Sequence, residues 1–259
     1  MEDNGLWLLI TLLDLSEMLE ERNSEADYWS ALAARLSERL APAEMCLLVA
    51  GNAGDMTVMG ASGAAVSKLA ALQIRLKQGP CIDSHKTGHA VLNEAVTTAD
   101  DRWPQFALAT VAAGFGMVSA LPMRRREQAM GVLFCAAAGT QQLADAELHV
   151  LEVVARTAAF VVVRQRDQRR HALASEQLQR ALDSRVLIEQ AKGAIAARLG
   201  TSPDRAFELL RGYARRENLT LAEVSSQAIR NTLSPHDLMA GAQAQRASRI
   251  RQPHAPHSR

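Results

Sequence analysis

Apolar residues recur along the first half of the chain with two periods, one typical of helices and one typical of strands. A spacing of three to four residues predicts amphipathic helices at 5–21, 25–40, 66–76 and 103–113. Alternation and short apolar runs predict β-strands at 45–50, 56–61, 90–96, 117–123 and 129–137. The helix at 5–21 has more apolar residues than one buried stripe needs, so we expect it to be buried in a dimer or against the main domain. Strands framed by helices in one block indicate a single α/β domain.

A long helix is predicted after this block. The 53 residues from Thr140 to Lys192 contain neither Gly nor Pro, and a continuous helix of that length would extend about 80 Å. Its first part, 148–163, is apolar enough to pack on the sheet, whereas 164–171 has no apolar residue and must be solvated. A weak heptad seam follows and is interrupted by Arg185; it consists of Ala174, Leu178, Ala181 and Ile188. This seam is too short to indicate a coiled coil, but it fits a signalling helix between paired subunits.

The C-terminal third of the chain predicts three short helices with clear ends. The first ends at Gly200, the usual residue for a left-handed helix terminus. The second begins with Ser202 as the N-cap and Pro203 at the first helical position. The third begins at Thr220, and Glu223 three residues later completes a capping box. Each helix has one apolar face, so the segment is expected to fold as a three-helix module.

Positive charge is concentrated in this module. From Arg185 to Arg216 it carries seven Lys or Arg residues against three acidic residues. Lys192 follows Arg185 by one heptad and Arg215 follows Arg211 by one turn, so each pair shares a helix face and can form a phosphate-binding stripe. Tyr213 lies among these arginines and is suited to stacking on an unpaired base. On spacing alone, a solvated basic face is an equally good interpretation.

The whole chain is nearly neutral, with a net charge of +1, but its charge is unevenly distributed. Residues 1–163 contain 12 basic and 19 acidic residues, whereas residues 164–259 contain 17 basic and 9 acidic residues. This asymmetry points to a polyanionic partner for the rear half. Three scattered cysteines are too few for a disulfide framework, so a reducing cytoplasm is expected. The apolar run at 6–13 is too short to span a membrane, and no membrane partner is expected.

Two stretches of the C-terminal module carry a family resemblance. They are IEQAKGAIAARLG at 188–200 and AFELLRGYARRENLTLAEV at 206–224, and they reach all three helices. They closely resemble the ANTAR family of RNA-binding transcription antitermination modules. The resemblance implies a small helical bundle that binds paired stem-loops in nascent RNA as a homodimer and so blocks a terminator hairpin. The RNA polymerase elongation complex is the further partner that this activity implies.

The resemblance also implies which side chains contact RNA. The family's conserved lysine and its basic and aromatic positions fall on Lys192, Arg198, Arg211, Tyr213 and Arg215. Arg185 and Arg216 fit the same basic stripe and are included as further RNA-binding candidates. Gly193 lies inside a predicted helix, where it costs about 1 kcal/mol relative to Ala. A close approach of RNA or of a partner helix would explain this glycine, and a local packing constraint is the alternative.

The first block has a resemblance of its own, over residues 25–163. It rests on QGPCIDSHKTGHAV at 78–91 and on DDRWPQFALATVAAGFGMVSALPMRRREQAMGVLF at 100–134. These stretches are similar to GAF domains that are fused to ANTAR modules in actinobacteria. The resemblance implies an antiparallel sheet flanked by helices, with a small-molecule pocket on one face. Because GAF domains bind many ligands or none, the resemblance does not identify the ligand.

Cys81, His85 and His89 recur at helical spacing, a pattern that also occurs among metal ligands. A metal site is not expected, because the neighbouring glycines and proline indicate a loop or a frayed helix and a fourth ligand is missing. Cys81 would act as a redox sensor only if its pKa were lowered, and a partly buried inert thiol is the favoured interpretation. A cysteine-dependent GAF enzyme, such as a methionine sulfoxide reductase, is the alternative from another class, and it needs paired reactive cysteines.

The acidic pair Asp100-Asp101 does not indicate a phosphoreceiver domain, because it lies in the middle of the block rather than after a first strand. The segment Asp101-Arg102-Trp103-Pro104 is instead expected to order a turn, with Trp103 as a packing anchor. The sequence has no glycine-rich phosphate loop and no catalytic triad signature, so neither a cofactor nor enzymatic activity is expected.

The sequence therefore predicts a two-domain cytoplasmic regulator. Its expected parts are an N-terminal helix (1–24), an α/β GAF sensor domain (25–163), a helical connector (164–181), an all-α three-helix ANTAR module (182–234) and a basic, disordered tail (235–259). A small molecule bound by the GAF domain would alter either dimerisation or the spacing of two RNA-binding modules. A dimer that binds RNA regardless of any signal is equally compatible with the sequence, and DNA binding is a minor alternative.

Overall fold

The computed structural model describes residues 7, 10–11, 25–40, 42–51, 54–234 and 236–239. The chain forms two compact units, Met1–Gln168 and Arg169–Arg259, and each is described by itself. The helix expected at 5–21 and the tail expected at 235–259 fall largely outside the described residues.

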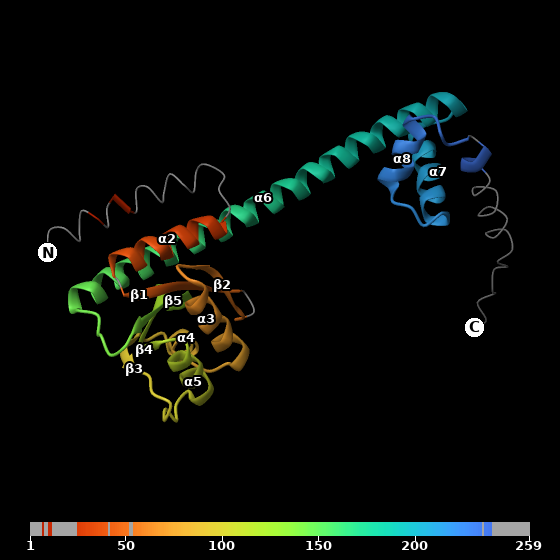
Figure 1. Ribbon diagram of the computed structural model, residues 1–259. Coiled ribbons are helices and arrows are strands. Elements are labelled where there is room, and N and C mark those ends of the chain that lie inside the picture. Colours follow the sequence, from red (N-terminus) through yellow and green to blue (C-terminus); the bar gives the residue numbers. More distant parts are fainter. Residues whose placement is uncertain are drawn as a thin grey trace, which may run out of the picture. The chain divides into compact units, whose positions relative to one another are not determined.

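The first unit is built on a five-stranded antiparallel sheet with the strand order β2-β1-β5-β4-β3 (Figure 1). Its strands are β1 (Ala43–Ala50), β2 (Met56–Ala61), β3 (Val91–Ala95), β4 (Phe115–Arg125) and β5 (Gln128–Ala138). The accompanying helices are α2 (Glu25–Arg39), α3 (Ala64–Leu76), α4 (Pro80–Thr87), α5 (Pro104–Ala112) and α6 (Asp145–Leu199), which continues into the second unit. All five strands predicted from the hydrophobic pattern are confirmed.

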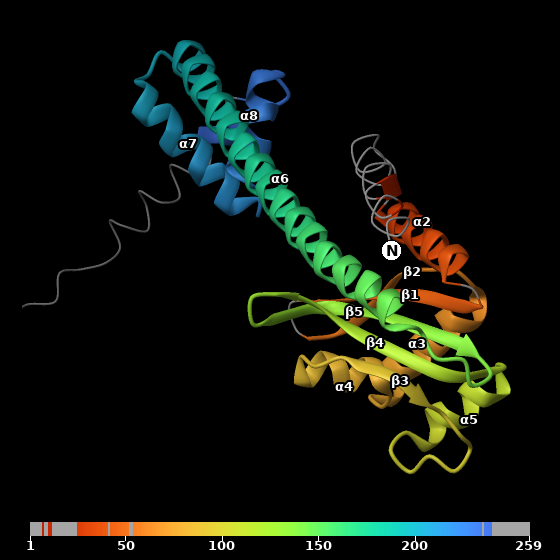
Figure 2. The same cartoon turned by 90° about the vertical axis from the view of Figure 1, so that its left-hand side faces the viewer.

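The sheet is buried on both faces, because its central strands alternate between two hydrophobic clusters. In β1, Met45 and Leu47 belong to one cluster, and Cys46 and Leu48 belong to the other. α2 and the first part of α6 cover the first face, and α3, α4 and α5 cover the second (Figure 2). Because successive side chains of a strand point to opposite faces of the sheet, the same strands contribute residues to both clusters.

The segment expected to be a loop or a frayed helix is the regular helix α4, so that prediction is wrong. The chain enters this helix at Gly79 with a φ of 130°, and Pro80 occupies the start of the helix. Gly88 ends it in the left-handed conformation with a φ of 70°. The glycines therefore define the ends of α4 rather than weakening its interior, because Gly adopts positive φ values at low cost.

α2 packs closely on β2 at Gly60. A Cβ atom at this position would collide with the backbone of Trp29 and Ser30 on the helix. The Trp29 side chain is fully buried and contacts the Tyr28 ring edge to face, with 4.8 Å between the ring centroids. The missing side chain at position 60 is what lets the helix reach this edge of the sheet.

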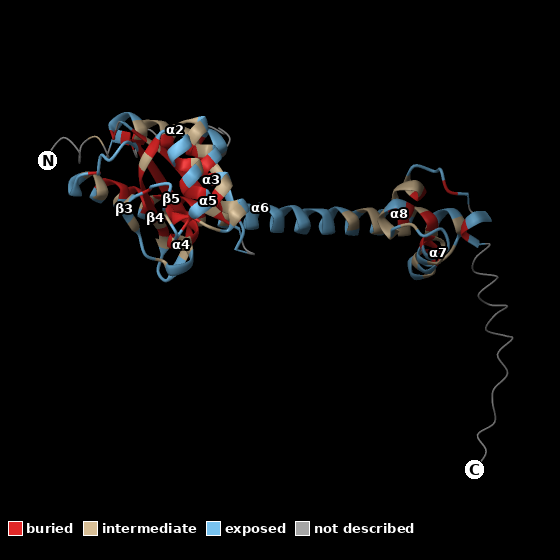
Figure 3. Cartoon of the chain, turned by 60° about the horizontal axis from the view of Figure 1, so that its bottom comes forward, coloured by how far each residue is buried: buried red, intermediate tan, exposed pale blue. Residues whose placement is uncertain are grey.

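α6 is a single helix, as the absence of Gly and Pro predicted. Its first part contributes Val150, Leu151 and Val154 to the cluster on the sheet. Residues 167–183 are all exposed (Figure 3). Side-chain pairs one turn apart occur in this exposed stretch, among them Glu176 and Arg180 with 3.0 Å between their charged atoms. Such pairs support a solvated helix by a few tenths of a kcal/mol each.

The second unit is the expected three-helix module, formed by the end of α6, α7 (Pro203–Arg216) and α8 (Leu221–Ile229). The predicted ends are confirmed: Gly200 has a φ of 58°, the Ser202 hydroxyl accepts a hydrogen bond from the Arg205 amide, and Thr220 and Glu223 form a capping box. Hydrogen bonds from Thr220 lower the pKa of Glu223. The core consists of Ala191, Ile195, Ala206, Leu210, Ala214, Val224, Ala228, Leu233 and Leu238.

Replacement of Gly60 by alanine is expected to lower the free energy of unfolding by about 1–3 kcal/mol, the usual cost of overpacking. The added methyl group would meet helix backbone, which cannot rotate away as a side chain can. Denaturant unfolding followed by circular dichroism measures the change. Gly193→Ala is the control, because among the described residues no atom outside its own helix turn lies within 4 Å of the added Cβ. It should stabilise α6 by about 1 kcal/mol, and a loss of stability there would contradict the structure.

Candidate nucleic-acid interface

The RNA-binding candidates predicted from the sequence separate into residues with partners and residues without. Arg185 on α6 and Arg211 and Arg215 on α7 are exposed, and none of the three has a hydrogen bond or an ion pair within the described part of the chain. Arg215 follows Arg211 by one turn, so both guanidinium groups extend from one face of α7. These cations are available to negative charges of a ligand.

Lys192 lies where α6 meets α7. Its Nζ atom is 3.0 Å from Oε2 of Glu189 and 5.7 Å from the centre of the Phe207 ring on α7. The lysine side chain is 19% exposed, whereas that of Glu189 is 60% exposed. Sequence reasoning did not select Phe207; the available signal was its position one turn before Arg211 on the basic face of the helix.

Three of the candidates contact the module itself. Arg198 donates a hydrogen bond of 2.8 Å to the carbonyl of Ala228 near the end of α8. Tyr213 packs against the hydrophobic cluster, and the guanidinium of Arg216 lies over its ring at 5.0 Å from the centroid. Arg216 also donates to the carbonyl of Asp237 at 2.8 Å. These contacts have a structural role, and a contact of the three side chains with RNA stays a prediction.

Gly193 in α6 and Gly212 in α7 have open space on the side where a side chain would lie. An added Cβ at either position would meet no atom of the described residues within 4 Å, apart from its own helix turn. A packing constraint within the described chain therefore does not explain either glycine. The close approach of a partner is the explanation that stays open for Gly193.

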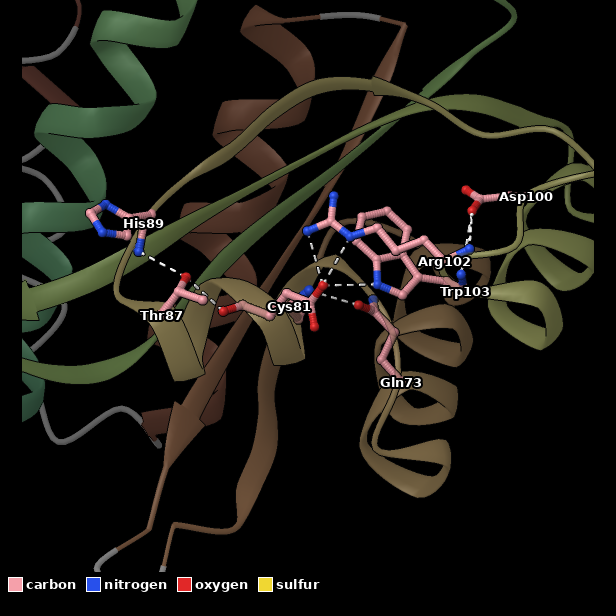
Figure 4. A network of polar contacts seen from close by, with 8 residues as sticks. Gln73, Cys81, Thr87, His89, Asp100, Arg102 and Trp103 are labelled. Carbon is pink, nitrogen blue, oxygen red and sulfur yellow. Dashed lines mark hydrogen bonds and ion pairs between the residues drawn. The ribbon is translucent and has the colours of Figure 1, made fainter.

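A polar network in the first unit joins α4 to the turn before α5 (Figure 4). Oδ2 of Asp83 accepts hydrogen bonds from Nε1 of Trp103 at 3.1 Å and from Nε of Arg102 at 3.2 Å. Oδ1 of Asp100 accepts from the backbone amides of Arg102 and Trp103. Because Trp103 is 2% exposed, the predicted ordered turn with a tryptophan anchor is confirmed.

The three cysteines are buried and free of disulfide bonds. Burial raises the pKa of Cys46 and of Cys135 to about 12, and it raises the pKa of Cys81 well above the ordinary value. The backbone amide of Cys81 donates to Oε1 of Gln73 at 2.8 Å. Because the thiolate is the reactive form, these environments are typical of inert thiols.

His89 lies beyond the end of α4, so it does not extend the helical spacing of Cys81 and His85. Burial lowers the pKa of His85. Within the described residues there is no group of three or more His, Cys, Asp or Glu side chains that could hold a metal ion.

Similar solved structures are found for the first unit. The GAF domain of a phosphoenolpyruvate-protein phosphotransferase from Acinetobacter is 14% identical, the match covers 65% of this chain and 97% of that chain, and the TM-score is 0.47. The corresponding domain from Coxiella burnetii is 14% identical, with 64% and 98% covered and a TM-score of 0.48. Free methionine-R-sulfoxide reductase from Neisseria meningitidis is 14% identical, with 64% and 94% covered and a TM-score of 0.46.

Protein-family models match both units. The model of the GAF domain matches residues 26–163, just over half of the chain, and the model of the ANTAR domain matches residues 176–229. None of the curated proteins matches the sequence. Among the described residues, no helix has the length and apolar character that a membrane crossing requires.

Arg198→Ala is expected to lower the free energy of unfolding of the second unit by about 1–2 kcal/mol, because the hydrogen bond to the end of α8 is lost. Arg211→Ala removes the same charge without removing a contact, so its effect should stay within about 0.5 kcal/mol. Thermal unfolding followed at 222 nm by circular dichroism compares the two variants, with the far-ultraviolet wavelength chosen for helix content. Equal losses would contradict the distinction between the two arginines.

The thiols of the folded chain are expected to react with a disulfide reagent at pH 8 about a hundredfold more slowly than those of the unfolded chain, because burial keeps them protonated. Absorbance of the released thiol measures both rates. A thiol that reacts at once in the folded chain would contradict this prediction and would favour the cysteine-dependent enzyme.

Proposed function

We propose that the chain is an RNA-binding regulator of transcription antitermination, since it belongs to the GAF domain family and carries an ANTAR domain C-terminal to its GAF domain. The supporting observation is the cationic surface of the ANTAR segment. Arg185, Arg211 and Arg215 are exposed and have no partner within the described residues, and Lys192 shares a face of α6 with Arg185. A cationic surface formed by two helices complements the phosphates of a folded RNA.

In the proposed complex, these four cations contact phosphates of a stem-loop. Each contact releases counterions from the RNA and strengthens binding without reading the sequence. Arg198, Tyr213 and Arg216 support this surface through their contacts within the module. A bound transcript cannot pair into a terminator hairpin, and the RNA polymerase elongation complex continues past the site. We place this activity in the cytoplasm, as expected from the sequence.

A second copy of the chain is the proposed partner of α6. Leu178, Leu182 and Val186 are 67%, 58% and 55% exposed, and they follow one another at four-residue spacing. A stripe of this kind is buried when two copies of a helix pair. Two RNA-binding modules in one dimer then bind two neighbouring stem-loops, and the second binding event gains from a high effective concentration.

The GAF domain is proposed to supply the input, with a small molecule as the signal. α6 contributes Val150 and Leu151 to the core on the sheet, and it contributes Ala191 and Ile195 to the core of the ANTAR segment. A ligand that binds two states of the GAF domain with different affinity shifts their populations. Through the shared helix, such a shift alters the pairing of α6 or the spacing of the two RNA-binding modules.

The proposal is tested by titrating the full chain against a tandem stem-loop RNA and its DNA counterpart at several salt concentrations. We expect tighter binding to RNA, with an affinity that falls steeply as salt rises. Lys192→Ala and Arg211→Ala should each weaken binding about 3- to 10-fold and reduce the salt slope by about one. Arg205→Ala is the matched control, because this arginine lies about 120° around the axis of α7 from Arg211 and is paired with Glu208 at 2.6 Å, so its loss should leave the affinity nearly unchanged.

Equal affinity for RNA and DNA would favour a DNA-binding regulator. No affinity for either would leave the helical module as a protein-interaction or dimerisation element. A single stem-loop should bind much more weakly than the tandem RNA, and equal binding of the two would contradict the dimeric arrangement.

A further inference from the structure

Phe207 and Tyr213 are the two aromatic rings of the second unit, and their environments differ. Tyr213 packs against the hydrophobic cluster of the unit. Phe207 is only partly exposed, yet among the described residues it neither belongs to that cluster nor packs on it. Its ring instead faces the ammonium group of Lys192 at 5.7 Å. A large apolar side chain that is excluded from the core of such a small module requires another explanation.

We propose that Phe207 is the platform on which an unpaired base of the bound RNA stacks, with Lys192 positioned for a phosphate beside that base. This inference rests on the proposed function and names a contact at its site. Aromatic side chains bind unpaired bases of any sequence, because every base has a π-face. Arg211 follows Phe207 by one turn on α7 and has no partner within the described residues, so a second cation lies beside the ring for the sugar-phosphate backbone.

Tyr213 is less suited to this role than its position among the arginines suggests. It lies six residues after Phe207, which places the two side chains about 120° apart around the axis of α7. The guanidinium of Arg216 covers its ring at 5.0 Å, and Arg216 is itself held by Glu217 at 3.0 Å and by the carbonyl of Asp237. Exposure of this ring to a base would therefore break three contacts and disturb the edge of the core.

The ring of Phe207 is easier to expose. Lys192 is 19% exposed, so its contact with the ring changes an equilibrium by a factor of about 2 to 30, between the values for an exposed and a desolvated cation. Lys192 is also bound to Glu189, but that carboxylate is 60% exposed, and ion pairs of exposed groups are weak. Base stacking on an aromatic side chain contributes a factor of about 5 to 150. In the proposed complex, a base displaces the ammonium group of Lys192 from the Phe207 ring, and a phosphate becomes the new charged partner of this ammonium group.

The test uses the full chain and the tandem stem-loop RNA that binds it most tightly among RNAs with different loop sequences. Phe207→Leu keeps an apolar side chain but removes the ring, and we expect it to lower the affinity about 10-fold while the salt slope stays unchanged. Phe207→Tyr retains the ring and should restore the affinity. Tyr213→Leu removes the other ring and should lower the affinity less than Phe207→Leu, because Tyr213 supports the surface through its contacts within the module and not by stacking on a base. Circular dichroism verifies that each variant folds.

The first part of a second measurement uses the unaltered chain and does not depend on a folded variant. The loop bases are replaced one at a time by 2-aminopurine, whose fluorescence falls when it stacks, and in a parallel series by abasic sites. With the unaltered chain, one loop position should lose fluorescence on binding, and an abasic site at that position should cost about 10-fold in affinity. In Phe207→Leu, the abasic site should cost nothing further, because the two changes remove one contact.

If the unaltered chain binds none of the tandem RNAs, the proposed function and this inference both fall. If it binds tightly but Phe207→Leu binds equally well, or if no loop base stacks, only the inference is overturned. A loss of the fluorescence change in Tyr213→Leu that Phe207→Leu leaves intact would assign the stacking to Tyr213 instead.

Discussion

The two hydrophobic cores of the chain share one helix, and both units depend on its continuity. α6 packs on the sheet through residues such as Leu151, and it completes the second core through Ala191 and Ile195. The residues at 167–183 are all exposed, so burial does not stabilise this stretch. Its helical structure depends on side-chain propensity, on pairs such as Gln179 with Asp183, and on propagation from the two packed ends, since extending a helix costs less than nucleating one.

The arginines of the second unit all lie on or near its basic helices, but they differ in their contacts. Arg198 holds the end of α8, and Arg216 covers an aromatic ring, whereas Arg211 and Arg215 extend into solvent. An arginine that already donates to a backbone carbonyl must give up that hydrogen bond before it can bind phosphate. An exposed arginine without a partner has no such cost. The charge count of the module therefore overstates the number of cations that a ligand finds available.

The cysteines of the first unit are candidates for reactive chemistry, but all three are buried in its structural core. Cys46 and Cys135 lie in adjacent central strands, and Cys81 lies in α4 behind the polar network of Asp83 and Trp103. Desolvation raises the pKa of each thiol, which disfavours the thiolate that a redox sensor or an enzyme requires. The three cysteines of the first unit therefore have the environments of inert thiols.

The sequence by itself determined the two families and the elements other than helix α4. Strand alternation, the caps at Ser202 and Thr220 and the long stretch without Gly or Pro are local signals, because each depends on residues within a turn or two of one another. Helix α4 was missed because the same glycines and proline that suggest a loop can also define helix ends, and local spacing does not distinguish the two. Only the tertiary structure decided which cations are available and that Lys192 meets Phe207. Helical periodicity states which residues share a face of one helix, but the crossing of α6 and α7 decides which faces meet, and that crossing depends on packing between residues distant in sequence.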